Sequence, residues 1–110
     1  MHFTLLLLFA AALLEAGGDA LVRTGLHASN VTTKAAFFLA GAVVLFSYGY
    51  IVNAPPWDFG RLLGIYVVFF FVVAQLISWL VFGQKPGTAV LLGGVFIIIG
   101  GVIISLGSSN

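Results

Sequence analysis

The chain has 110 residues, of which 62% are hydrophobic and only 6% are charged. Soluble globular domains are about 45–50% apolar and about 25% charged, so this composition predicts a protein embedded in a membrane. Four membrane-spanning helices of about 20 residues each would use most of the chain and leave no room for a soluble domain. Four basic and three acidic residues are scattered along the sequence, which excludes a polyanion-binding patch and hence nucleic acid as a partner.

Four apolar runs, separated by polar or turn-forming residues, predict the membrane spans. The first run also resembles the apolar part of a secretory signal peptide, but no Lys or Arg precedes it and we interpret it as a true span. We expect one all-α transmembrane domain over residues 1–110. Its spans cover residues 3–24, 33–52, 59–82 and 88–106.

The connections between these spans are short, so neighbouring helices are expected to be antiparallel, with both termini on one side of the membrane. Pro55 and Pro56 must break the chain between the second and third spans, because consecutive prolines cannot continue a helix.

Basic residues near the span ends indicate the orientation. Arg23, Lys34 and Lys85 share one side, which favours the cytoplasm for that side, and Arg61 lies on the other. The difference is so small that the same chain can insert in both orientations.

Three ionisable residues of the first span, Glu15, Asp19 and Arg23, recur every four residues and therefore lie along one stripe of the helix. Counted from Phe3, Glu15 lies about 18 Å into the membrane, just beyond its midplane. A charged carboxylate there costs about 2.5–3.5 kcal/mol, so it must face protein or a water-filled cavity. This cost makes Glu15 the leading candidate for a functional residue.

Burial and a neighbouring acid both disfavour the charged form of Glu15, whereas a bound cation would restore it by direct pairing. Proton and cation would then compete for one carboxylate, as in a proton-coupled exchanger. The alternative is that Glu15 only holds helices together through hydrogen bonds. Asp19 either takes part in binding or merely pairs with Arg23, four residues further along the helix.

Aromatic side chains of the second and third spans, among them Tyr48, Tyr50 and Tyr66, suit a lipophilic cation through cation–π contact. Aromatic residues are also ordinary lipid-facing residues.

Glycines of the fourth span recur every seven residues at Gly93, Gly100 and Gly107, and Gly94 and Gly101 repeat the pattern one position on. This period keeps small residues on one helix face, where another helix backbone can approach closely. We interpret the first set as an association seam between subunits.

No nucleotide-binding loop, nucleophile motif or pair of acid and base residues is present, so we expect no enzyme. The chain has no cysteine and its two histidines do not form a ligand set, which predicts neither metal nor cofactor.

The whole chain resembles the small multidrug resistance family. The segment Glu15-Ala16-Gly17-Gly18 is similar to that family's glutamate segment in the first helix, and Ser78-Trp79-Leu80-Val81-Phe82-Gly83-Gln84-Lys85 is similar to the end of its third helix. Counting from these motifs places Tyr66 at a pocket-lining position, and Gly93 and Gly100 at the dimer seam. Gly60-Arg61 and the aromatic third span are similar to a YnfA-like branch.

The resemblance implies an antiparallel homodimer that exports organic cations in exchange for protons, with Glu15 in a central pocket. We therefore expect an integral protein of the bacterial inner (plasma) membrane, with a small organic or lipophilic cation, a proton and membrane lipid as its partners. Two alternatives remain, a non-transporting accessory subunit of a membrane complex and a flippase-like carrier of an amphiphilic lipid headgroup.

Overall fold

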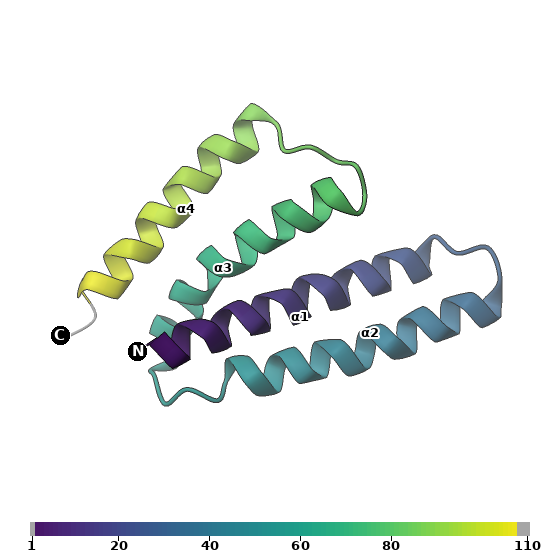
Figure 1. The fold of residues 1–110 in the computed structure, drawn as a ribbon, viewed down its shortest axis with the longest axis horizontal. Helices are drawn as coiled ribbons and strands as arrows, with labels where there is room; N and C mark the ends of the chain where they lie inside the picture. The colour runs from purple at the N-terminus through teal and green to yellow at the C-terminus, as the bar shows by residue number, and fades with distance from the viewer. Residues whose placement is uncertain (1, 108–110) are drawn as a thin grey trace. The chain divides into compact units, whose positions relative to one another are not determined.

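The computed structural model describes residues 2–107, and within them it contains four helices and no strand. Met1 and the tail 108–110 of the predicted domain lie outside the described residues. The predicted all-α fold is confirmed (Figure 1). The helices are α1 (His2–Leu26), α2 (Val31–Val52), α3 (Phe59–Leu80) and α4 (Thr88–Gly107).

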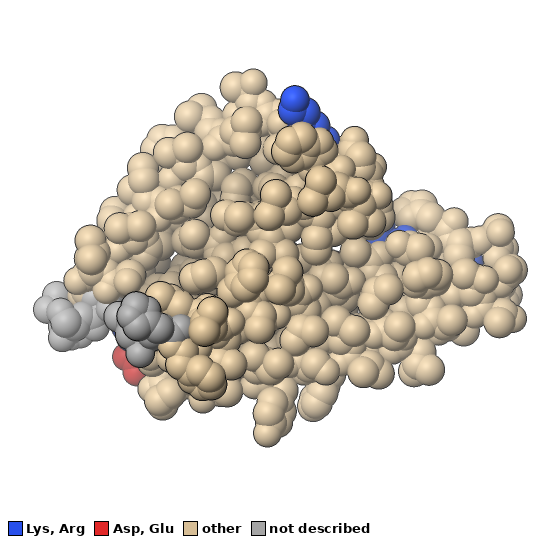
Figure 2. All heavy atoms as spheres, viewed as in Figure 1, with Lys and Arg blue, Asp and Glu red and all other residues tan. Residues whose placement is uncertain are grey.

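Each helix contains an apolar segment long enough to cross a membrane. At about 1.5 Å per residue, even a 20-residue helix reaches the roughly 30 Å of a hydrocarbon core. Almost all of the surface visible in Figure 2 comes from residues other than Lys, Arg, Asp and Glu, as a lipid-facing surface requires. The described helices that are long and apolar enough to cross a membrane are Phe3–Leu26, Val31–Val52, Phe59–Leu80 and Thr88–Gly107, which is consistent with a protein of four spans.

The connection between α1 and α2 is tightened by side chains that bond to the helix ends. The Asn30 side chain accepts a hydrogen bond of 2.7 Å from the Thr33 backbone N–H, so that α2 begins at Val31, two residues before the predicted start. The Lys34 ammonium donates to the carbonyl of Leu26 at 3.0 Å. This bond satisfies a carbonyl at the C-terminal end of α1, which runs two residues past its predicted end.

At the other end of the chain, α3 stops at Leu80, two residues before the predicted end. Gly83 adopts a left-handed backbone conformation with φ 67°, which ends the helix without the strain a side chain would bring. The N–H groups of Gly83 and Gln84 bond back to the carbonyls of Trp79 and Ser78 at 3.1 and 2.9 Å. The Ser78 hydroxyl donates to the Gln84 carbonyl as well, at 3.2 Å.

The helices form two compact units, one up to Ala54 and the other from Pro55 onward. The first unit is the hairpin of α1 and α2, whose helices lie side by side along their length (Figure 1). The second unit is the hairpin of α3 and α4, which contact one another less extensively.

Candidate functional site

Glu15 directly follows Leu14, the central residue of α1. The Glu15 side chain is half-buried. The Tyr48 hydroxyl, from the facing helix α2, donates a hydrogen bond to the Glu15 carboxylate. The charge of Asp19 also acts on the Tyr48 phenol. The first hairpin therefore holds, near the middle of a membrane span, a carboxylate with a polar partner from the neighbouring helix.

Close packing of α1 against α2 determines which residues face each other. At three levels of the hairpin a glycine on one helix faces a larger side chain on the other. A Cβ added to any of these glycines would lie only 2.7–2.8 Å from that side chain, so the helix axes approach as closely as glycine permits. The pairs are Gly25 with Phe38, Val22 with Gly41, and Gly18 with Leu45.

These pairs define an antiparallel register. From Gly25 to Val22 to Gly18, α1 steps back by three and then four residues, while α2 steps forward by three and then four. A further step of three leads from Gly18 to Glu15 on α1, and from Leu45 to Tyr48 on α2. The hydrogen bond between Glu15 and Tyr48 is thus the next level of the same packed interface.

Asp19 lies about 6 Å further along α1 than Glu15 and its side chain is exposed. Arg23, also exposed, belongs to the last turn of α1, where a basic residue complements the negative end of the helix dipole. Both of the roles predicted for Asp19, in binding or in pairing with Arg23, stay predictions.

Tyr66, predicted to line the pocket, belongs to α3 in the second unit. Its ring lies 6.3 Å from the Phe70 ring between centroids, at a tilt of 35°. Gly64, two positions earlier, faces Ile104 of α4, so Tyr66 lies on the side of α3 away from α4. Its participation in a site with Glu15 stays a prediction.

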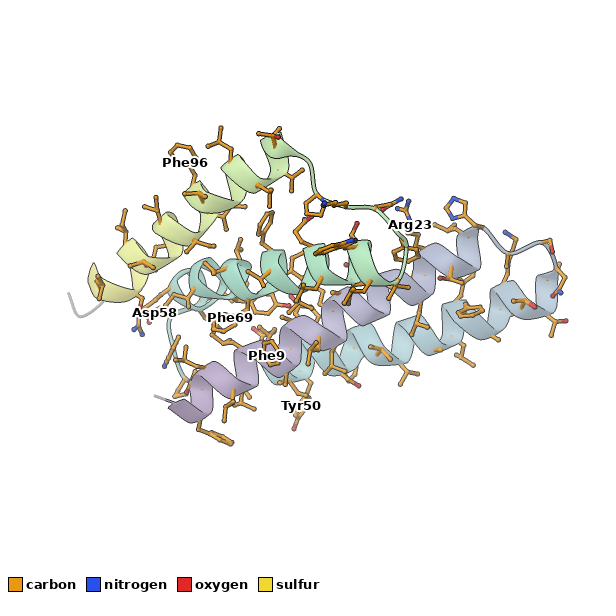
Figure 3. The ribbon with its side chains drawn as sticks, turned by 45° about the horizontal axis from the view of Figure 1, so that its top comes forward. Phe9, Arg23, Tyr50, Asp58, Phe69 and Phe96 are labelled. Carbon is orange, nitrogen blue, oxygen red and sulfur yellow. The ribbon has the colours of Figure 1, made fainter. Side chains whose placement is uncertain are left out.

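The glycines of α4 separate into two groups. Gly94 and Gly101 face α3 within the chain, where an added Cβ would clash with Phe71 and Val68. Around Gly93, Gly100 and Gly107, the residues of the predicted seam, an added Cβ would meet no atom of the described residues within 4 Å, apart from its chain neighbours and its own helix backbone. The exposed Phe96 side chain also points away from α3 (Figure 3). Gly94 and Gly101 therefore pack against α3 within the hairpin, whereas the set that begins at Gly93 forms an open face of α4.

The segment from Ser78 to Lys85, which motivated part of the family resemblance, forms the turn that ends α3. Besides the backbone bonds at Gly83 and Gln84, the Lys85 ammonium lies 5.8 Å from the centre of the Trp79 ring, within cation–π range. At the start of α3, the Arg61 guanidinium lies 4.5 Å from the Trp57 ring. Both pairs place a cation and an indole at the end of a span, where such residues anchor helices at the membrane interface.

The possible chemistry of the site is binding of a cation or proton. Within residues 2–107, no three His, Cys, Asp or Glu side chains come together as metal ligands would. A carboxylate bonded to a phenol can accept a proton or pair with a cation, and neither process requires a covalent step.

Sequence reasoning did not single out Tyr48. Its signal was nevertheless present, because Gly41, Leu45 and Tyr48 follow the spacing of one face of a helix. Identifying that face as the one opposite Glu15 required the pairing of α1 with α2.

Comparison with known proteins supports one part of the resemblance. The family model described as "Uncharacterised BCR, YnfA/UPF0060 family" matches residues 1–109. The chain is also 37% identical, over 87 residues, to the "UPF0060 membrane protein YfjF" of Bacillus subtilis (strain 168), an alignment that covers 78% of this chain and 77% of that protein. No solved structure matches the chain.

These matches agree with the YnfA-like branch, whereas the narrower assignment to the small multidrug resistance family stays an expectation. Together with the four spans, the bacterial relative identifies an integral protein of the bacterial plasma membrane. A family match over nearly its whole length shows that the chain belongs to the YnfA/UPF0060 family of membrane proteins.

Proposed function

We propose that this protein is a proton-coupled secondary transporter that exports a small organic or lipophilic cation, with Glu15 as the shared site for proton and cation. The observation that carries the proposal is the carboxylate near the middle of α1 with a phenol donor from α2. A residue that only joined helices could be an amide or hydroxyl, at a lower cost of insertion than an ionisable acid.

Competition of proton and cation for one carboxylate couples the movement of the cation to the movement of the proton. A cation that enters the site favours the charged carboxylate, so the proton leaves, and a returning proton displaces the cation. Aromatic walls would add cation–π attraction and apolar contact, the role that we propose for Tyr66. This process consists of binding and release, so we propose neither an enzymatic step nor a cofactor.

Assembly as an antiparallel homodimer would complete the site. The open face of Gly93, Gly100 and Gly107 supports this arrangement, because a second helix can approach there without displacing any part of the same hairpin. The exposed Asp19 side chain also supports a dimer or a water-filled cavity, since a carboxylate this deep in the bilayer is not expected to face lipid.

The test is transport by purified protein in liposomes under an imposed pH gradient, with guanidinium, polyamines and aromatic cations as substrates. We expect wild-type protein to move at least one cation against protons, and Glu15→Gln to abolish this movement while the protein still folds. Asp58→Asn is the matched control, because it also neutralises an acid, but one in the loop before α3.

Equal transport by wild type and Glu15→Gln would overturn the mechanism. If the wild type transports none of these cations, the accessory-subunit alternative gains support, because the open glycine face also suits docking to another membrane protein. Movement of fluorescent lipid across the same liposomes would instead favour the flippase-like alternative.

A further inference from the structure

Among the hydroxyl groups of the first hairpin, Tyr48 is distinguished by where it bonds. Thr24 and Ser47 each donate to a carbonyl four residues earlier in their own helix, at 2.8 and 2.9 Å. These bonds satisfy the hydroxyl within one helix and connect nothing else. The Tyr48 hydroxyl instead crosses to α1 and bonds to Glu15.

The packing around this hydrogen bond limits how far α2 can shift along α1. Gly18 and Leu45 form the adjacent level of the interface, and a Cβ on Gly18 would lie 3.3 Å from the Leu45 backbone nitrogen as well as against its side chain. Because the backbones are this close, α2 cannot shift along α1 without a clash. Tyr48 is therefore kept opposite Glu15 by contacts that do not involve either residue.

A phenol suits both protonation states of a carboxyl group. It donates to the charged carboxylate, and its oxygen can accept from the protonated acid. The bond to the charged form is the stronger of the two, because hydrogen bonds to ionised groups are about twice as strong as neutral ones. Tyr48 thus partly replaces the water that the carboxylate lacks in the membrane.

We propose that Tyr48 is a positioning residue that holds the Glu15 carboxylate in place and favours release of its proton. This inference deepens the proposed function and rests on it for its significance, but the interaction itself can be measured without transport. The titratable groups whose charges act on the Tyr48 phenol are Glu15 and Asp19, both on α1.

The sequence supplies a direct probe, because Glu15 is its only glutamate. Carbon-13 labelling of glutamate therefore reports one carboxyl group, whose titration can be followed by NMR in lipid bilayers. We expect Tyr48→Phe, which removes only the hydroxyl, to move this titration to higher pH by about 0.5–1 unit. The matched control is Tyr50→Phe, since Tyr50 is 74% exposed and points away from α1 (Figure 3). It should titrate like the wild type.

Repeating the comparison in an Asp19→Asn background removes the second acid, and the shift should persist. A second measurement uses wild-type protein, so its result does not depend on whether a variant folds. In wild-type protein labelled at the tyrosine ring carbon that bears the hydroxyl, the Tyr48 signal should change with the Glu15 titration, whereas the Tyr50 signal should not. Identical titrations in wild type and Tyr48→Phe, or a Tyr48 signal that ignores Glu15, would overturn the inference.

Measuring transport together with the titration distinguishes failure of this inference from failure of the proposed function. If Tyr48→Phe shifts the titration but the wild type exports no cation, Tyr48 still positions Glu15 and the transporter proposal fails. If the wild type exports cations and Tyr48→Phe leaves the titration unchanged, the transporter proposal stands without this role for Tyr48.

Discussion

Val22 of α1 fills the space that a side chain at Gly41 of α2 would need. A Cβ on Gly41 would lie 2.7 Å from a methyl group of Val22, 3.4 Å from its backbone nitrogen and 3.3 Å from the carbonyl oxygen of Gly18. Because valine has little rotamer freedom in a helix, its methyl group cannot turn aside, and the backbone oxygen cannot either. The separation of the two helices is therefore set at this point.

Gly41→Ala should push α1 and α2 apart and destabilise the protein by about 1–3 kcal/mol, the usual cost of overpacking. The thermal unfolding temperature in detergent measures this loss. Gly49→Ala on the same helix is the control, because an added Cβ there would meet no other side chain of residues 2–107 within 4 Å. That variant should be at least as stable as the wild type, because alanine favours a helix more than glycine does. Equal stability of both variants would show that the glycine contacts do not limit the packing.

Neighbouring glycines of α4 are predicted to respond differently to the same substitution. Gly100→Leu should weaken self-association and leave the hairpin intact, because it adds bulk to the open face. Gly101→Leu should lower thermal stability, because the side chain would clash with Val68 of α3. Chemical crosslinking in lipid gives the dimer fraction and a melting curve gives stability. Undiminished crosslinking in a Gly93→Leu, Gly100→Leu double variant would contradict the seam assignment.

Asp19→Asn distinguishes the two predicted roles of this residue. If Asp19 only pairs with Arg23, the variant should keep cation-induced proton release within about two- to threefold of the wild type, since an exposed ion pair contributes little energy. If both acids serve the site, release should fall as far as in Glu15→Gln. The measurement is proton release from purified protein on addition of substrate, and an Arg23→Gln variant shows the effect of losing the pair alone.

The fold could be predicted from the sequence because its main determinants are local. Runs of apolar residues are long enough to span a bilayer, and Pro55 and Pro56 mark the boundary between the two hairpins. Glu15 could be chosen as a candidate residue as well, because an acid in such a run is costly wherever its helix packs. Two observed helix ends differ by two residues from the predicted ones. The Asn30 cap makes α2 begin at Val31, and the left-handed Gly83 follows the end of α3 at Leu80.

The partners of these residues depend on how the helices pair, and the sequence pattern does not contain that information. Tyr48 and Tyr50 are the same residue type, two positions apart on α2. They differ in their contacts only because the face that carries Tyr48 meets α1. In the same way, the seven-residue repeat of α4 fits both of its glycine sets equally well. Only the contact with α3 shows that Gly94 and Gly101 are used within the chain, and that the set at Gly93 and Gly100 remains open.

The hydrogen bond between Glu15 and Tyr48 lies entirely within the first 54 residues. A chain emerging from the ribosome can therefore complete the α1 and α2 hairpin before α3 and α4 have been synthesised. The acid can then enter the bilayer with its phenol partner beside it, before a second hairpin or a second subunit is present. Biosynthesis of the protein can thus bring its most costly residue into the membrane as part of a preassembled pair.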